Sequence, residues 1–208
     1  PTRRSSDLVA MMDYTKKILE MTNKNNGYIT SLQVTNEHIP RVYLKLLVDS
    51  GLLEQSARGV YISPSVFDDE MFNLQNRFKK GVFSHETALF LHDLTDRTPV
   101  RYKMTFPAGY NTTSAKNKNV ITYYSIKDRY EVGITTMTTS CGLEVRVYNK
   151  ERTLCDLLQK RSNTDLQVLT QAIKQYTQQT KKDIPLLSEY AKLFKVEKRL
   201  RPYLEVLL

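Results

Sequence analysis

The chain is short of cysteine and glycine, and each shortage excludes a kind of site. Only Cys141 and Cys155 are cysteines among 208 residues, and their separation of 14 positions fits no zinc-ligand spacing. A single pair is a weak disulfide framework for a chain of this length, so we expect two reduced thiols, as in a cytoplasmic protein. The seven glycines form no phosphate-cradling loop.

Long apolar runs are absent as well. No segment approaches the roughly 20 consecutive apolar residues that a membrane-spanning helix needs, and no charged-then-apolar leader precedes the first expected helix. We therefore expect a cytoplasmic protein with no membrane partner. The length suffices for one large domain or two small ones, each with its own core.

No group of residues has a catalytic spacing. His85 and His92 are seven positions apart, whereas zinc proteases place two histidines four apart with a glutamate between them. Ser84, His85 and Glu86 have the letters of a catalytic triad, but adjacent helical side chains do not face each other, and Ser84 is expected to cap the helix instead. The acidic run at residues 68–70 fits the first turn of a helix. We expect no catalytic residue, no metal and no cofactor.

Positive charge is in excess. Thirty-one Lys and Arg residues against 22 Asp and Glu residues give a net charge of +9, which suits a polyanionic partner such as DNA. Residues 1–66 hold 8 basic and 6 acidic side chains, and residues 67–208 hold 23 and 16. The excess therefore lies mainly in the second part of the chain, and composition alone does not say which part binds the partner.

The first 66 residues have the pattern of a winged helix-turn-helix. Apolar spacing predicts a helix that ends in the Asn-rich run at 23–27, a short strand at 28–29 and a short helix from residue 30 to 35. A turn at 36–38 leads to a helix at 40–50, which Gly51 ends, and two β runs at 52–54 and 60–62 form a hairpin. In this motif the second helix of the pair enters the major groove of DNA.

Six residues of this domain are candidates for DNA contact. Arg41 near the start of the 40–50 helix can bond guanine with two parallel hydrogen bonds, and Lys45, one turn later, suits a phosphate. Arg58 at the hairpin tip suits a minor groove or backbone contact, and hydroxyls at the start of the short helix suit a phosphate. The candidates are Arg41, Tyr43, Lys45, Arg58, Ser31 and Thr30. The alternatives are solvated charges, a core position for Tyr43, and a winged helix that binds protein.

The second part of the chain predicts an α+β domain. A connecting helix is expected within residues 67–80, and a helix capped by Ser84 extends to residue 94. Four β-rich runs follow at 100–106, 120–125, 132–138 and 143–148, with a polar loop at 108–119 between the first two. From residue 151 the apolar spacing is helical and predicts four helices, two of them with Pro185 and Pro202 near their starts. Segregated strands and helices predict an α+β domain at 81–208 without βαβ units.

Several basic residues of this domain form a possible binding surface. They lie in a loop and around the last helix: Lys181, Lys182, Lys195, Lys198, Arg199 and Arg201. Such runs usually keep a protein soluble, but they also suit nucleic acid or an acidic protein. The sequence leaves these alternatives open.

Two long segments resemble the AbiEi proteins, the antitoxins of bacterial AbiE abortive-infection systems. The first is GVFSHETALFLH at residues 81–92, continued by LTDRTP at 94–99. The second is YNKERTLCDLL at residues 148–158, and the YLE at 203–205 is also similar. With the expected winged helix, the resemblance covers nearly the whole chain.

The resemblance implies a function that the residues alone do not. Such proteins repress their own promoter by binding inverted repeats through the N-terminal domain. Their C-terminal domain is needed to neutralise a co-encoded nucleotidyltransferase-like toxin in a type IV system for phage resistance, without a stable complex. The resemblance supplies no catalytic residue. Two other functions stay open: an interaction module whose winged helix binds protein and whose basic domain binds RNA, and an enzyme that reverses the toxin's modification.

Overall fold

The computed structural model describes the backbone of residues 3–207 and the side chains of residues 11–207. The chain folds into two compact units. The first contains Pro1–Arg77 and Thr139–Leu143, and the second contains Phe78–Thr138 and Glu144–Leu208. The fold is α+β, with eleven α-helices and two sheets among the described residues. None of the helices in this range has the length and apolar character to cross a bilayer.

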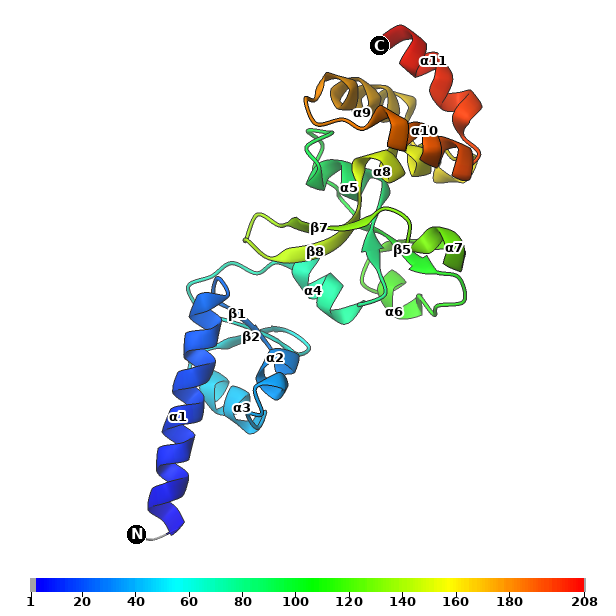
Figure 1. Ribbon diagram of the computed structural model, residues 1–208. Coiled ribbons are helices and arrows are strands. Elements are labelled where there is room, and N and C mark those ends of the chain that lie inside the picture. Colours follow the sequence, from blue (N-terminus) through cyan, green and yellow to red (C-terminus); the bar gives the residue numbers. More distant parts are fainter. Residues whose placement is uncertain (1–2, 208) are drawn as a thin grey trace. The chain divides into compact units, whose positions relative to one another are not determined.

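The first unit combines four helices with a small antiparallel sheet (Figure 1). Its helices are α1 (Arg3–Lys24), α2 (Ser31–Asn36), α3 (Val42–Asp49) and α4 (Glu70–Arg77). Its strands are β1 (Tyr28–Thr30), β2 (Glu54–Ala57) and β3 (Val60–Ile62), in the spatial order β1-β3-β2. The expected order of elements in residues 1–66 is therefore present.

Strand β2 begins later than the sequence predicts. The first two residues of the expected run at 52–54 still belong to the turn that ends α3, because the backbone N–H groups of Leu52 and Leu53 both donate to the carbonyl of Leu47. Gly51 makes this end possible, since its φ of +71° lies in the left-handed region that suits glycine. Leu53 then turns into the core, and the extended pairing starts at Glu54.

Two small cores hold the first unit together. One contains Ile18 of α1, Ile29 of β1, Val34 of α2 and Leu44 and Leu47 of α3. The other contains Tyr28, Val60 and Ile62 of the sheet together with Leu143. The segment Thr139–Leu143 thus supplies apolar surface to a core that is otherwise made from residues between positions 28 and 72.

Polar contacts fix this segment as well. The Thr139 hydroxyl donates to the Asp69 carboxylate at 2.5 Å, and the Asn26 side-chain amide donates to the carbonyl of Gly142 at 2.9 Å. Asp69 also caps α4 by accepting from the backbone N–H of Phe72 at 3.0 Å. The segment is therefore an integral part of the first unit, which an N-terminal boundary at residue 66 or 80 leaves out.

The second unit is built on a five-stranded mixed sheet. Its strands are β4 (Val82–Phe83), β5 (Lys103–Pro107), β6 (Ile121–Ser125), β7 (Ile134–Thr138) and β8 (Glu144–Tyr148), in the order β6-β5-β4-β8-β7. The four expected strands are present. The expectation of no βαβ unit is wrong, because β5 and β6 pair in parallel and α6 (Thr113–Lys116) lies in the connection between them. Strand β4 also pairs in parallel with β8.

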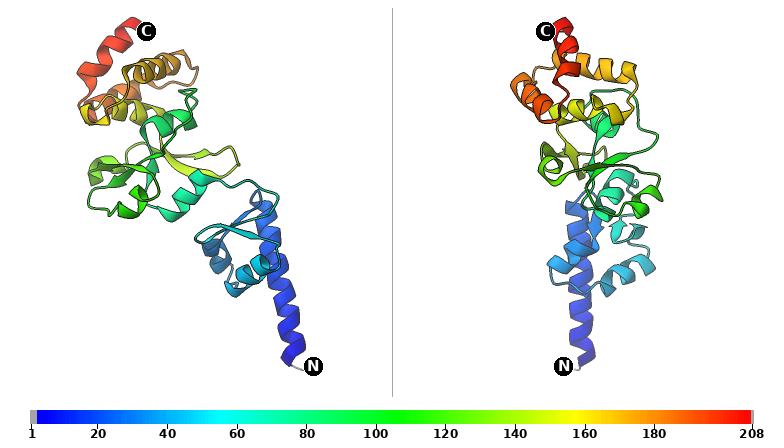
Figure 2. Two further views of the ribbon diagram at one scale, coloured as in Figure 1. Left: turned by 180° about the vertical axis from the view of Figure 1, so that it is seen from behind. Right: turned by 90° about the vertical axis from the view of Figure 1, so that its right-hand side faces the viewer.

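Helices cover the sheet of the second unit (Figures 1 and 2). Helices α5 (His85–Leu91) and α8 (Lys150–Leu157) pack against each other, and α9 (Leu166–Gln178), α10 (Ile184–Leu193) and α11 (Glu197–Leu207) complete a helical layer around α8. Helix α7 (Lys127–Tyr130) packs near β5 and α6 packs near β6. Pro202, expected near a helix start, lies inside α11.

The main core lies between these helices. Its fully buried members include Leu89 of α5, Leu154 of α8, Ile173 of α9 and Leu187 of α10. Cys155 is buried among them, and Cys141 of the first unit is half-buried; both are free thiols. Burial raises the pKa of the Cys155 thiol, so this side chain acts as a small apolar group.

Candidate functional site

Helix α3 presents a mixed face to solvent. Leu44 and Leu47 are buried, whereas Arg41 and Lys45 are exposed at a spacing of four residues, which places them on one face. The same exposed side contains Val42, which is 63% exposed, and Leu46. The predicted basic pair therefore faces outward, beside apolar side chains that the sequence analysis did not assign to this face.

Arg41 is held in place by the helix before it. It occupies the N-cap position of α3, and its Nε donates to the Thr35 hydroxyl of α2 at 2.8 Å. Within the described part of the chain its two terminal nitrogens donate no hydrogen bond. The guanidinium is thus positioned by one bond and keeps the donors with which arginine recognises a guanine or a phosphate.

Arg58 lies close in space to the start of α2. It is exposed in the turn between β2 and β3, next to Gly59, whose φ is +77°. The Ser31 backbone N–H donates to the Gly59 carbonyl at 2.9 Å. A Cβ on residue 59 would stand 2.9 Å from the Ser31 Oγ, so only glycine lets the turn approach this closely.

Three of the six predicted contact residues point inward or are already bonded. Tyr43 is half-buried and its ring lies 5.2 Å from that of Tyr14, so the core alternative applies. Thr30 is buried and forms a capping box with Gln33, in which each side chain bonds the backbone of the other. Ser31 is half-buried beside Gly59. Arg41, Lys45 and Arg58 remain as exposed cations of the predicted interface.

The Ser84 and His85 side chains meet, contrary to expectation. His85 has a φ of +54°, so its side chain does not follow helical geometry, and its Nδ1 lies 3.0 Å from the Ser84 Oγ. Ser84 makes no capping hydrogen bond, and its Oγ instead accepts from the Thr105 hydroxyl at 2.8 Å. Glu86 instead forms an ion pair with Lys103 at 2.5 Å.

The Ser84–His85 pair does not have the properties of a nucleophile and base. Ser84 is completely buried, and burial together with Lys103 lowers the pKa of His85 to about 3. The His85 ring stacks on Tyr123 at a centroid distance of 3.7 Å. His92 is also buried and bonds the Tyr148 carbonyl at 2.7 Å. No cluster of three potential metal ligands occurs among the residues that the structure describes.

The six basic residues predicted as a C-terminal surface do not form one patch. Lys181 and Lys182 precede the start of α10, and Lys195, Lys198, Arg199 and Arg201 follow its end, so the two groups lie at opposite ends of that helix. All six are exposed, but Lys182 donates to the Thr177 carbonyl and Arg199 to the Leu158 carbonyl. These two side chains therefore also stabilise the fold.

A buried ion pair that the sequence analysis missed lies at the centre of the second unit. Arg152 and Asp156 of α8 are 2% and 6% exposed at their side chains, and the Arg152 Nε lies 3.0 Å from both carboxylate oxygens. Arg152 Nη1 also donates to the carbonyls of Arg129 and Val132. An Arg and an Asp four positions apart in one helix are the signal in the sequence that could have indicated it.

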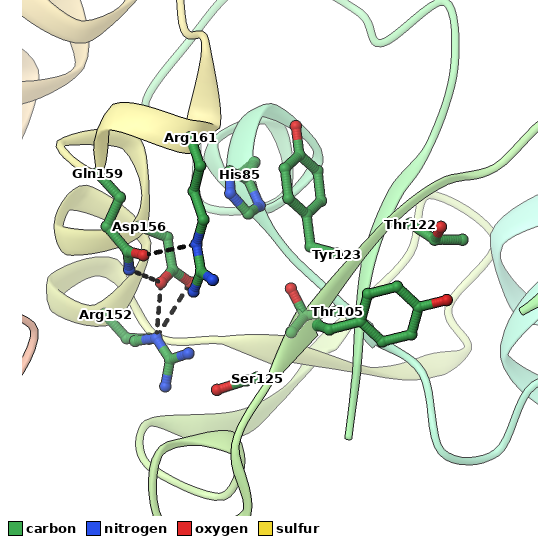
Figure 3. Close-up of a pocket in the computed structure, with 10 residues that line it drawn as sticks. His85, Thr105, Thr122, Tyr123, Ser125, Arg152, Asp156, Gln159 and Arg161 are labelled. Carbon is green, nitrogen blue, oxygen red and sulfur yellow. Dashed lines mark hydrogen bonds and ion pairs between the residues drawn. The ribbon is translucent and has the colours of Figure 1, made fainter. Parts of the chain in front are cut away.

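Two adjoining cavities border this ion pair, with volumes of about 210 and 220 Å³. Five residues line both: Tyr124, Ser125, Arg152, Gln159 and Arg161. Figure 3 shows the side chains of Arg152, Asp156, Gln159 and Arg161 on one side of the first cavity, and those of strands β5 and β6 across from them. All of these residues belong to the second unit.

Comparison with known proteins gives a likeness of fold. No protein-family model and no curated protein matches the chain. Among solved structures, the chain is similar to the crystal structure of the RV2827C protein from Mycobacterium tuberculosis, with a TM-score of 0.55 and 10% sequence identity. The match covers 86% of this chain and 71% of that one. At this identity the similarity concerns the fold alone.

Proposed function

We propose that the first unit is a winged helix-turn-helix that binds double-stranded DNA, and that the protein represses its own promoter as an AbiEi-type antitoxin in the cytoplasm. The order α1-β1-α2-α3-β2-β3 supports the motif, as does the sheet order β1-β3-β2. In such a motif α3 is the recognition helix and the β2–β3 hairpin is the wing.

The observation that most supports DNA binding is the exposed side of α3. Arg41 stands at its N-terminal end with free terminal nitrogens, and Lys45 follows one turn later. Arg58 adds a cation on the wing, beside the start of α2. Arg41 is assigned to a base edge, and Lys45 and Arg58 are assigned to phosphates or the minor groove.

The second unit is assigned to antagonism of a co-encoded nucleotidyltransferase-like toxin, without a stable complex. The two segments that resemble AbiEi proteins lie side by side in this unit. Phe83 of the first pairs with Val147 next to the second, α5 packs on α8, and His92 bonds the Tyr148 carbonyl. Their contact supports the view that they form one structural unit rather than two unrelated motifs.

The first test measures DNA binding by fluorescence anisotropy, with a duplex from the chain's own upstream region and a scrambled duplex. Arg41→Ala is expected to weaken binding about 10- to 100-fold and to reduce the preference for the upstream sequence, because a bidentate base contact is lost. Lys174→Ala, which removes the same charge from an exposed position on α9, is the matched control and should bind as the wild type does.

Lys45→Ala and Arg58→Ala address the phosphate contacts. Each should weaken binding to all sequences alike and reduce the slope of log affinity against log salt by about 1. Equal affinity of the wild type for upstream and scrambled DNA at moderate salt would reject sequence-specific repression.

The exposed apolar side chains favour a second candidate function. Leu32 of α2 and Val42 of α3 are 46% and 63% exposed, and such side chains also suit a protein partner. A winged helix that binds protein predicts that Val42→Ser abolishes partner capture while Arg41→Ala does not. DNA recognition predicts the reverse order of effects, since Arg41 then provides the base contact.

Antitoxin action is tested by co-expression with the neighbouring gene in the intact chain. The double variant Arg41→Ala/Arg58→Ala should still restore growth, because the proposal places toxin antagonism in the second unit. Loss of rescue by this variant, at wild-type protein levels, would contradict that division of labour.

A further inference from the structure

We propose that the two cavities around Arg152 bind a nucleotide through its phosphate group. This site is separate from the DNA interface, because all its residues belong to the second unit. Each cavity is smaller than the roughly 300–1,000 Å³ of typical small-molecule sites. The shared lining makes the two together a site of nucleotide size.

Arg152 supplies unused donors to these cavities. A guanidinium has five N–H groups, and three of them are accounted for by Asp156 and by the carbonyls of Arg129 and Val132. The two N–H groups of Nη2 donate no hydrogen bond to any group that the structure describes. Because the side chain is 2% exposed and lines both cavities, these donors are available only to a molecule that enters there.

The position of this guanidinium is fixed in advance. The rings of Tyr148 and Phe194 lie 4.2 and 4.1 Å from its central carbon, and the Asp156 carboxylate holds its Nε. Gln159 donates to Asp156 at 3.1 Å and accepts from the Nε of Arg161 at 3.0 Å, which orients the second guanidinium (Figure 3). A preorganised pair of planar guanidinium groups matches the oxygens of a phosphate.

The charge of the lining favours an anion. Arg152 and Arg161 line both cavities, Arg129 lines the second, and Asp156 is the carboxylate of the first. Three guanidinium groups and one carboxylate leave a net charge of +2, which a phosphate monoester dianion balances. His85 adds no charge, because burial and Lys103 keep its ring neutral.

The opposite wall offers hydroxyls and aromatic rings. The Ser125 hydroxyl, on β6, has only a long contact of 3.5 Å to the Ile126 carbonyl, so it is free to bond a ligand oxygen. Tyr124 lines both cavities and is 41% exposed, while its hydroxyl is fixed by Thr112 at 2.5 Å. The space beyond the guanidinium groups has room for a nucleoside, which distinguishes a nucleotide from inorganic phosphate.

The test is isothermal titration calorimetry of the full chain with adenosine 5′-monophosphate, adenosine, inorganic phosphate and citrate at constant ionic strength. We expect saturable binding of the monophosphate and binding at least about tenfold weaker for the other three. Equal binding of citrate would overturn the assignment to phosphate, and equal binding of inorganic phosphate would overturn the role of the nucleoside. No binding of the monophosphate at millimolar concentration would overturn the site itself.

Two variants locate the binding without removing the buried pair. Arg161→Ala should weaken binding of the monophosphate about tenfold or more, the loss expected for a charge-assisted hydrogen bond. Lys160→Ala removes the same charge from the adjacent exposed residue, which lines neither cavity, and should bind as the wild type does. Equal effects of the two variants would reject the cavity as the binding site.

The phosphate group can come from a free nucleotide or from the 5′ end of an RNA strand. Binding of a short single-stranded RNA with a 5′-phosphate, compared with its 5′-hydroxyl form, distinguishes these two sources. Tighter binding of the phosphorylated strand than of the free monophosphate assigns the site to a strand end, and weaker binding assigns it to a free nucleotide. In either case Arg161→Ala should leave binding to promoter DNA unchanged, so failure of this site and failure of the DNA interface are distinguishable.

Discussion

Two ionisable side chains of the second unit are buried, one of them neutral and the other charged. His85 is neutral, stacks on Tyr123, bonds the Ser84 hydroxyl and has a left-handed backbone conformation. Arg152 is charged and is stabilised by Asp156 and by two aromatic rings. In the sequence, nothing distinguishes these two residues from other polar residues of amphipathic segments. Their roles arise from long-range contacts, which is why residue spacing did not indicate the cavity and assigned Ser84 to a cap that it does not form.

The neutral state of His85 predicts a dependence of stability on pH. Burial lowers its pKa from 6.5 to about 3, so the unfolded chain takes up a proton below pH 6.5 that the folded chain does not. The free energy of unfolding should therefore fall as the pH drops from about 6.5 towards 3, by up to about 1.4 kcal/mol per pH unit. His92, whose pKa burial also lowers, adds to the same trend.

Urea denaturation between pH 7 and pH 5 measures this effect at pH values above those at which most carboxylates titrate. His85→Asn should flatten the profile, because asparagine tolerates a positive φ and does not titrate. His38→Asn is the matched control, since His38 also has a positive φ, of 58°, but is exposed. A profile that is equally steep in both variants would show that His85 is not the group responsible.

Loss of one partner of the buried ion pair should destabilise the protein strongly. Arg152→Met leaves the Asp156 carboxylate buried without its cation, which is expected to cost about 3–5 kcal/mol. Arg152→Met/Asp156→Leu should recover much of this loss, because an apolar pair carries no desolvation penalty. Guanidinium denaturation of both variants checks the order, and a double variant less stable than the single one would contradict it.

At the scale of elements, local signals predicted most helices and strands and missed their pairing. Strands β5 to β8 lie within a few residues of the predicted runs, because each has enough β-branched and aromatic residues to be recognised. Strand β4 has two residues, too few for a pattern. The parallel pairings of β5 with β6 and β4 with β8 depend on contacts between distant segments, and no local signal specifies them.

The capping box at the start of α2 should contribute to the stability of the first unit. Thr30→Ala removes the hydroxyl that accepts from the Gln33 backbone and is expected to cost about 1 kcal/mol, whereas Thr30→Ser keeps that hydroxyl and should cost less. Thermal denaturation measures both variants. If Thr30→Ser is as destabilised as Thr30→Ala, methyl packing rather than capping is the important contribution.

At the scale of the whole molecule, the first unit depends on a segment far along the chain. Leu143 is 3% exposed and packs with Tyr28, Val60 and Ile62. Leu143→Ala is therefore expected to destabilise the first unit by about 2–5 kcal/mol. Hydrogen exchange should show faster exchange in β1 and β3, while α8 to α10 keep their protection. Faster exchange confined to β7 and β8 would contradict this assignment.

The contacts of the turn at 139–143 with the first 72 residues could not be predicted from the sequence. Nothing in the composition of this turn distinguishes it from an ordinary loop, and its partner Asp69 was read as part of an acidic helix start. The predicted division at residues 66 and 80 treats each domain as one continuous stretch. The contact between Asp69 and Thr139, which are 70 positions apart, is seen only in the structure.

Because Thr139–Leu143 belongs to the first unit, the polypeptide passes between the units three times: after Arg77, after Thr138 and after Leu143. No single cut yields both units intact, and a chimera that replaces the first unit must also carry the five residues Thr139–Leu143, which lie within the sequence of the second unit. After a protease nick at any one passage, only non-covalent packing within the units holds the two fragments together. Exchange of domains between relatives by simple recombination is correspondingly restricted.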